Sequence, residues 1–368
     1  MIEPRLDRVV VHDYLQVNGG AERLVLTAAR AFPASRLLVS GVYPGFARTA
    51  DVGGVDIRVA GRLLRLLPRV IRALLVFGWP ASLRIDAAAV LYSGIYAPLA
   101  ARRQTRGRRI YYCQTPPRFA FDRRQEYLER VPRLLRPVLG WAFNRYRSVY
   151  SRAVHGMDLV LTNSRHVQAR LERDLGIHAK VLYPPIDTHG LTWLGQHDYY
   201  LSVGRLEANK RVEQIVRAFL LLPDRQLVVA SGGSQLARLR RLSEGAPNIR
   251  FTDWVDDSTL NELIGHAVAV LYLPRDEDFG MSAVEAMAAG KPVIGVAEGG
   301  LKETVVDGET GILLDGDPVP EAIAQAVTEL TPERAAAMRM ACERRAQLFS
   351  RERFVAELNA CCAAAPEV

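Results

Sequence analysis

The sequence has few cysteines, few lysines and no long hydrophobic segment. Its 368 residues include four cysteines, Cys113, Cys342, Cys361 and Cys362, whose spacing is not that of a metal site. A chain of this length can bury a core without disulfides, so we expect reduced thiols in a cytoplasmic protein. Uncharged, mainly apolar runs such as residues 73–83 are too short to cross a bilayer, and we expect no signal peptide before the first strand.

Only four lysines are present, so arginine carries most of the positive charge. Residues 1–190 hold 30 Lys and Arg against 14 Asp and Glu, a net +16, whereas residues 191–368 hold 18 against 26, a net −8. This split indicates different partners for the two halves, and a basic first half suits an anionic lipid surface or an acidic acceptor. The alternative is an arginine-rich composition spread over a neutral surface. No nucleic-acid partner is expected, because the arginines are not interleaved with stacking aromatic residues.

Short Val, Ile, Leu and Tyr runs alternate with helical patterns along the whole chain. The expected strands are residues 8–11, 36–40, 88–92, 109–113, 159–162 and 181–183, then 199–203, 226–230, 249–252, 268–273, 292–296 and 311–314. Unbroken apolar strands are typical of parallel sheets covered on both faces. The sequence therefore predicts an α/β protein with two doubly wound parallel sheets.

Proline-rich and polar segments between the predicted strands mark the domain boundaries. A proline-rich exit, Tyr183-Pro184-Pro185-Ile186-Asp187, precedes a polar stretch and a new strand. We expect an N-terminal domain of residues 1–187 and a C-terminal domain of residues 188–348. Residues 349–368 form a final helix capped by Ser350, which we expect to cross back onto the N-terminal domain.

The strongest local motif runs from Asp276 to Gly290, after a strand and into a helix that begins near Met281. Gly280 permits close approach of a ligand to the backbone, and the first amides of the helix point at an anion. Glu285, about one turn inside, can accept hydrogen bonds from a diol such as a ribose. Glu277 can reach the group beyond the phosphate. The bland alternative is a helix with ordinary acidic residues near its start.

Two further motifs follow strands. In Val203-Gly204-Arg205-Leu206-Glu207-Ala208-Asn209-Lys210, two cations can clamp a diphosphate at the carboxyl edge of a parallel sheet, although a solvated basic loop would look the same. After the first strand, Gly19 and Gly20 precede a helix. They resemble a phosphate-approach loop, but a tight turn explains them equally well.

Together these motifs resemble retaining glycosyltransferase family 4, which has the GT-B fold, over nearly the whole chain. The most specific features are the spacing of Glu277 and Glu285 around Phe279-Gly280, the Arg205 and Lys210 pair, and the segment from Val305 to Gly311. Residues 112–118 and 182–187 are similar to mannosyltransferases of surface-polysaccharide assembly. The resemblance implies two Rossmann-like domains that face a cleft, and GDP-mannose as the preferred donor.

The resemblance also implies roles for individual residues. Arg205 and Lys210 would neutralise the donor diphosphate, and Glu285 would hold the ribose. Glu277 would hold sugar hydroxyls. Further donor contacts would come from Gly19, Gly20, Val255, Phe279, Gly280, Met281 and Ser282. No metal or cofactor is expected, because arginine and lysine take the place of a divalent cation beside the departing phosphate.

One residue departs from the family pattern. The family usually carries His where this chain has Gln114, which can hydrogen-bond but cannot titrate. Either a neutral amide suffices, because the departing phosphate oxygen can itself deprotonate the acceptor, or another group such as His12 substitutes. We place Gln114 among the catalytic residues, and His12, Arg118 and Asp122 on the acceptor side.

A basic amphipathic segment lies at residues 62–75, with Arg62, Arg65, Arg69 and Arg72 at helical spacing. Pro68 is expected to divide it into two helices. Such a segment can lie in an anionic membrane interface, while the alternative is a buried helix with a solvated arginine stripe. Arg102-Arg103, Arg106 and Arg108-Arg109 add a second basic cluster.

The sequence therefore predicts a metal-independent, retaining hexosyltransferase of polysaccharide biosynthesis. It would move mannose from GDP-mannose to a glycan or lipid-linked acceptor, at the inner face of the plasma membrane. One alternative is a nucleotide-sugar-binding protein whose activity is weak or lost because of Gln114. The other is a GT-B epimerase, which would need acid and base groups converging on the sugar.

Overall fold

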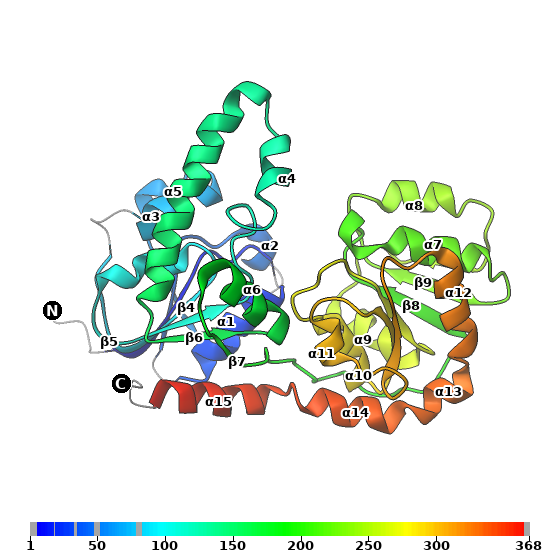
Figure 1. Ribbon diagram of the computed structural model, residues 1–368. Coiled ribbons are helices and arrows are strands. Elements are labelled where there is room, and N and C mark those ends of the chain that lie inside the picture. The colour runs from blue at the N-terminus through cyan, green and yellow to red at the C-terminus, as the bar shows by residue number, and fades with distance from the viewer. Residues whose placement is uncertain (1–5, 18, 33–34, 48–51, 79–82, 364–368) are drawn as a thin grey trace. The chain divides into compact units, whose positions relative to one another are not determined.

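The computed structural model describes residues 6–17, 19–32, 35–47, 52–78 and 83–363, which form two compact units (Figure 1). Unit 1 comprises Met1–Pro185 and Phe354–Val368, and unit 2 comprises Ile186–Arg353. Each unit is built on one sheet, and every pair of neighbouring strands in either sheet is parallel. The predicted α/β fold with two parallel sheets is therefore confirmed.

The sheet of unit 1 has seven strands in the order β3-β2-β1-β4-β5-β6-β7. Their bounds are β1 Leu6–His12, β2 Arg36–Val39, β3 Asp56–Val59, β4 Ile85–Ser93, β5 Gln104–Cys113, β6 Leu159–Thr162 and β7 Lys180–Val181. The strand order reverses direction between β1 and β4: β2 and β3 follow on one side, and β5, β6 and β7 on the other. The carboxyl ends of β1, β4 and β5 therefore meet at the centre of one sheet edge, where open α/β sheets bind ligands.

Helices cover both faces of this sheet. They are α1 Gly20–Arg30, α2 Pro44–Ala47, η1 Arg62–Leu64, α3 Arg69–Gly78, η2 Ala97–Arg103, α4 Arg124–Glu129, η3 Arg133–Leu135, α5 Arg136–His155, α6 Arg165–Leu175 and α15 Arg351–Ala363. Along β1, Val9 and Val11 join a core with α3, η2, α5 and α6, while Val10 joins a second core with α1 and α15. This alternation explains why β1 reads as an unbroken apolar run.

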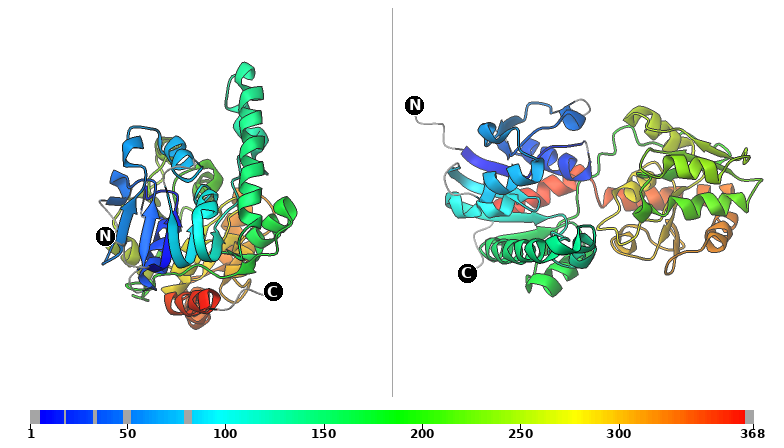
Figure 2. Two further views of the ribbon diagram at one scale, coloured as in Figure 1. Left: turned by 90° about the vertical axis from the view of Figure 1, so that its left-hand side faces the viewer. Right: turned by 90° about the horizontal axis from the view of Figure 1, so that it is seen from above.

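The last helix of the chain belongs to unit 1. Phe354, Leu358 and Cys361 of α15 are buried in the core that contains α1. The ring of Phe354 meets that of Tyr112 edge to face, with centroids 6.1 Å apart. Asn359 accepts a hydrogen bond of 2.6 Å from Arg8 on the first strand. Residues more than 300 positions apart in the sequence thus complete one face of the sheet (Figure 2).

The sheet of unit 2 has six strands in the order β10-β9-β8-β11-β12-β13. They are β8 Tyr199–Val203, β9 Gln226–Ala230, β10 Ile249–Phe251, β11 Val270–Tyr272, β12 Val293–Val296 and β13 Gly311–Leu314. The helices are η4 Ala208–Lys210, α7 Val212–Leu220, α8 Leu236–Leu242, α9 Asp257–His266, α10 Met281–Ala288, α11 Leu301–Thr304, α12 Pro320–Glu329, α13 Pro332–Ala337 and α14 Arg339–Gln347. The strand order places β8 and β11 next to each other at the centre of the sheet, so the loops after them lie side by side.

Two expectations need correction. The strand β3 was not predicted, because it is a four-residue edge strand whose side chains are half-buried or exposed. Pro68 divides residues 62–75 into a single 3₁₀ turn and the helix α3, as expected, but the four arginines do not form one exposed stripe. Arg72 is buried, so it does not belong to a membrane-facing surface, and the side chain of Arg62 lies outside the described residues.

The same segment exposes large apolar side chains instead. Arg65 and Arg69 are exposed, and so are Leu63, Leu66 and Ile71. Leu63 is 99% exposed and Leu66 is 91% exposed. No helix in the described part of the chain is long and apolar enough to span a bilayer.

Candidate functional site

Lys210 is held at the carboxyl edge of the sheet in unit 2. It ends the short helix η4, which follows the loop that leaves β8 at Gly204. Its Nζ donates to the hydroxyl of Tyr272 at 3.0 Å and to Oε2 of Glu277 at 2.7 Å. The ammonium also lies over the Tyr272 ring, 5.1 Å from the centroid. Three contacts therefore fix one cation beside the loop after β11.

Tyr272 is a site residue that sequence reasoning missed. It is the last residue of β11 and is buried, so only its hydroxyl edge meets polar groups. Burial raises the pKa of Tyr272 well above its ordinary value, and the negative charge of Glu277 adds to this effect. The phenol therefore stays neutral, and Ser282 is a further hydrogen-bond partner of its hydroxyl. The only sequence signal was a tyrosine at the end of a central strand.

Glu277 lies in a loop with tightly packed backbone. Its carbonyl oxygen accepts from the amide of Gly300 at 2.8 Å. Gly299 has a φ of +54°, and a Cβ there would lie 2.2 Å from the same carbonyl oxygen. Only glycine allows this close approach, so the Gly299-Gly300 turn after β12 holds the backbone of the Glu277 loop in a fixed position.

The helix α10 begins at Met281, as the motif predicted. Its N-cap is Gly280, with a φ of +94° that other residues rarely adopt. The amides of Met281 and Ser282 belong to the first helical turn, where no intrahelical acceptor exists. Glu285 follows one turn later and is half-buried, and its charge also raises the pKa of Tyr272. The start of α10, with its first-turn amides, thus lies next to the Lys210, Tyr272 and Glu277 cluster.

Arg211 joins the two loops that carry these groups. It is buried and adopts a left-handed backbone conformation, with φ +51°. Its guanidinium forms ion pairs with Glu298 at 2.8 Å and Asp317 at 2.6 Å, and donates to the carbonyl of Leu273. Because Arg211 follows Lys210 directly, these contacts anchor the β8 loop to the loop after β11. Sequence reasoning missed Arg211 as well, although it was adjacent to a predicted site residue.

The other predicted donor residues are less constrained. Arg205 is exposed. The pKa of Glu207 is lowered mainly by hydrogen bonds from Ser234, and the charge of Arg205 adds a smaller effect. Val255 is half-buried beside Trp254, which is 67% exposed. Phe279 is buried and meets the ring of Phe349 edge to face. Among the described residues, no group of three or more His, Cys, Asp or Glu side chains is placed to hold a metal ion.

In unit 1, His12 and Gln114 converge on one residue. Nδ1 of His12 lies 3.0 Å from the carbonyl oxygen of Ser93, and Nε2 of Gln114 donates to the Ser93 hydroxyl at 2.9 Å. The backbone carbonyl of Gln114 accepts a hydrogen bond of 2.9 Å from the side-chain amide of Asn163. His12 ends β1, Ser93 ends β4 and Gln114 follows β5, and these are three neighbouring strands of the sheet. Burial lowers the pKa of His12 to about 4, so the imidazole is neutral near pH 7.

Asp13 forms a second buried group at this edge. Its carboxylate accepts from the backbone amides of Ile95, Tyr96 and Ala97 at 2.7–2.8 Å. Burial raises the pKa of Asp13 to about 6, although the three amide hydrogen bonds oppose that rise. The carboxylate holds the loop after β4 in place; Gly94 in that loop has a φ of +107°, and a Cβ there would lie 2.5 Å from Cγ of Asp13. Asp13 was not predicted as a site residue.

The remaining predicted residues of unit 1 lie on loops and helix starts. Gly19 is the N-cap of α1, and Gly20 is its first residue. The carboxylate of Glu22 accepts from the amides of Gln16 and Val17 and so holds the loop before the helix. Arg118 and Asp122 pair with each other at 2.6 Å, four residues apart.

Both halves of the chain match known families. Residues 18–189 match the family described as Glycosyltransferase Family 4, and residues 191–348 match Glycosyl transferases group 1. A GDP-mannose-dependent alpha-(1-6)-phosphatidylinositol monomannoside mannosyltransferase of Mycolicibacterium smegmatis is 30% identical over 237 residues, which are 55% of this chain and 61% of the relative. A D-inositol 3-phosphate glycosyltransferase of Mycobacterium sp. (strain KMS) is 35% identical over 156 residues, covering 40% of this chain and 35% of the relative. The matched parts thus span about a third to three fifths of these relatives.

Solved structures share the fold over nearly the whole chain. Anabaena HepE in complex with UDP and glucose has a TM-score of 0.74 at 15% identity and covers 97% of this chain and 99% of that one. Sucrose-phosphate synthase from Thermosynechococcus elongatus has a TM-score of 0.71 at 18% identity, covering 96% and 98%. The fold is GT-B. The chain belongs to glycosyltransferase family 4 and is related to its mannosyltransferases.

Proposed function

We propose that this protein transfers mannose, with retention of configuration, from GDP-mannose to a glycan or lipid-linked acceptor. The observation that carries the proposal is the placement of the Lys210 ammonium between Tyr272 and Glu277, next to the start of α10. A cation and helix amides fixed before the reaction are the elements that stabilise a departing diphosphate. GDP-mannose is preferred because a relative at 30% identity is named for that donor.

The transfer breaks the bond between the anomeric carbon and the phosphate oxygen and forms one to the acceptor oxygen. The acceptor proton passes to the departing diphosphate oxygen. Lys210 and Arg205 neutralise the negative charge that grows there, Glu277 orients sugar hydroxyls, and Glu285 holds the ribose. This route needs no side-chain base, which agrees with a Gln at position 114 and a His12 whose pKa is about 4.

The acceptor and its location form the second part of the proposal. The mycobacterial relative is named for a phosphatidylinositol monomannoside acceptor, which is a lipid. In unit 1, Leu63 and Leu66 are exposed beside Arg65, a combination suited to an anionic membrane interface. We therefore place the protein at the cytoplasmic face of the plasma membrane, bound peripherally.

A nucleotide screen followed by a transfer assay tests the proposal. GDP at about one hundred times its Kd should stabilise the fold by about 2.7 kcal/mol, which raises the melting temperature by a few degrees. UDP and ADP should have smaller effects, and Glu285→Ala should reduce the GDP effect to about half or less. Labelled GDP-mannose should then yield a labelled glycolipid in extracts of polar lipids.

The outcomes separate the alternatives. A shift with UDP in place of GDP would replace the donor, as in the UDP complexes of HepE. A shift without turnover would favour a nucleotide-sugar-binding protein that lost activity through Gln114. If no nucleotide shifts the melting temperature, the donor site around Lys210 is wrong.

A further inference from the structure

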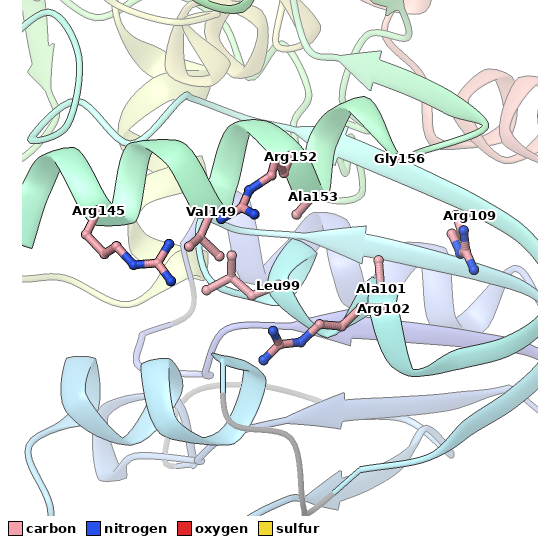
Figure 3. Close-up of a pocket in the computed structure, with 9 residues that line it drawn as sticks. All are labelled: Leu99, Ala101, Arg102, Arg109, Arg145, Val149, Arg152, Ala153 and Gly156. Carbon is pink, nitrogen blue, oxygen red and sulfur yellow. The ribbon is translucent and has the colours of Figure 1, made fainter.

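A pocket of about 410 Å³ in unit 1 is rich in arginine. It is lined by Leu99, Ala101, Arg102, Arg109, Arg145, Val149, Arg152, Ala153 and Gly156, which include four arginines and no carboxylate. Figure 3 shows Arg145 and Arg152 projecting from α5 and Arg102 from the end of η2, with Leu99 and Val149 between them. Arg109 lies toward the other end of the pocket.

The four guanidinium groups are not neutralised by ion pairs within the described residues. Arg102 donates to the carbonyl of Gly78, and Arg152 donates to the carbonyl of Ser148 at 3.3 Å. Nε of Arg109 is buried and has no hydrogen-bond partner there. Asp158 accepts from the backbone amide of Arg109 at 2.7 Å but does not line the pocket. Like charges in one pocket repel each other, and a bound anion would remove that repulsion.

The pocket is separate from the residues that converge on Ser93. Arg109 precedes Gln114 by five positions along β5 and its exit, which corresponds to about 16 Å of extended chain. The pocket is therefore set back from the sheet edge where His12, Ser93 and Gln114 meet. Its arginines belong in part to the second basic cluster of the sequence, to which the proposed reaction gives no role.

We propose that this pocket binds a phosphate ester whose remaining part is apolar. Guanidinium groups match phosphate oxygens with paired hydrogen bonds, so several arginines without a carboxylate select such an anion. The volume lies within the range of small-molecule sites and exceeds what one phosphate fills. Leu99 and Val149 offer apolar surface to the rest of the ligand. A glycerophospholipid has both parts, and a soluble phosphate ester has only the first.

The surroundings favour the lipid. The helix α5 that supplies Arg145 and Arg152 begins with large exposed apolar side chains, and its first turns project beyond the sheet of unit 1 (Figures 1 and 2). Val138 and Trp141 in the first turns of α5 are 66% and 69% exposed, and Leu134 in the preceding turn η3 is 91% exposed. Exposed tryptophan and leucine near arginine are typical of segments that enter a membrane interface. One helix thus carries an apolar end and an anion-binding end.

Vesicle flotation with the full chain tests this inference. Arg145→Gln with Arg152→Gln removes two pocket charges at exposed positions. The matched control is Arg147→Gln with Arg173→Gln, because neither residue lines the pocket and the change of charge is the same. On vesicles of phosphatidylcholine with phosphatidylglycerol, the pocket variant should lose at least tenfold in affinity, and the control at most threefold. Glycerophosphoglycerol, the head group without acyl chains, serves as the soluble probe by calorimetry.

Each result either supports or contradicts the phosphate site, or shows whether the phosphate comes from a lipid. If parent and control bind both vesicles and soluble head group better than the pocket variant does, the phosphate alone is sufficient. If the difference appears only with vesicles, the source is a lipid. If the pocket variant floats and titrates like the control, the pocket is not a phosphate site. Thermal shift with GDP on the same variants reports the donor site independently, so failure of either proposal is recognised separately.

Discussion

The ammonium of Lys210 and the carboxylate of Glu277 lie 2.7 Å apart, and both side chains are largely buried. They come from loops after different strands, 67 positions apart in the sequence. A partly buried ion pair fixes both groups before a ligand arrives, which lowers the reorganisation needed during reaction. The pair also holds the lysine at a position where a diphosphate is proposed to depart.

Lys210→Ala should lower kcat by a factor of about 10²–10³, because it removes a preorganised group that stabilises developing charge. Initial rates of mannose transfer at saturating donor measure the effect. Lys302→Ala is the control, since Lys302 is an exposed lysine of the same unit. Equal rates for Lys210→Ala and the parent protein would remove Lys210 from the mechanism.

Tyr272→Phe keeps the ring under Lys210 and deletes only the hydroxyl. One hydrogen bond contributes about 1 kcal/mol, so kcat should fall about fivefold with little change in the donor KM. Tyr200→Phe is the matched control, because the Tyr200 hydroxyl is also buried and bonds only backbone carbonyls of Val327 and Leu330. Tyr200→Phe should lower the melting temperature without changing kcat, and a loss of activity shared by both variants would point to stability alone.

Glu285→Ala should weaken GDP binding tenfold to a hundredfold, the loss expected when a hydrogen bond to a charged group, about 1.5–3 kcal/mol, is removed. Calorimetric titration with GDP measures it. The variant Glu321→Ala changes an exposed acid of α12 and should leave the affinity unaltered. Unchanged binding by Glu285→Ala would show that the ribose is held elsewhere.

His12 should make the protein less stable in mild acid. Its pKa falls from 6.5 in the unfolded chain to about 4 when folded, so between these values the unfolded state binds the extra proton. The free energy of unfolding therefore rises with pH across this window, with a contribution of up to about 1.4 kcal/mol per pH unit. His12→Gln should remove that contribution.

Urea unfolding of parent and variant at several pH values between 4 and 6.5 checks this slope. Asp13 contributes with the opposite sign, because its pKa is raised to about 6 and its stabilisation is lost as the pH rises through that value. Comparing the two proteins cancels the Asp13 effect. Parallel curves for both would mean that His12 is not buried in the neutral form.

The sequence predicted the parallel sheets and the start of α10, since both rest on local patterns. Unbroken apolar runs located eleven of the thirteen strands, although β4 and β5 begin at Ile85 and Gln104, before the expected residues 88 and 109, while Lys180–Val181 was shifted and Asp56–Val59 was missed. Long-range partners could not be predicted in the same way. That Tyr272 would lie under Lys210, or that Arg211 would reach Asp317, depends on how loops from different strands pack. No local signal in a single sequence encodes that packing.

The burial of α15 in unit 1 has a consequence for how the protein is made. The core around Phe354 and Leu358 is completed by residues that leave the ribosome only after all of unit 2. N-terminal domains usually fold while the rest of the chain is being synthesised. Here the part of this core that α15 covers stays exposed until α15 is synthesised, so a ribosome that stalls before it releases a chain with a finished second half and an incompletely covered, aggregation-prone first half.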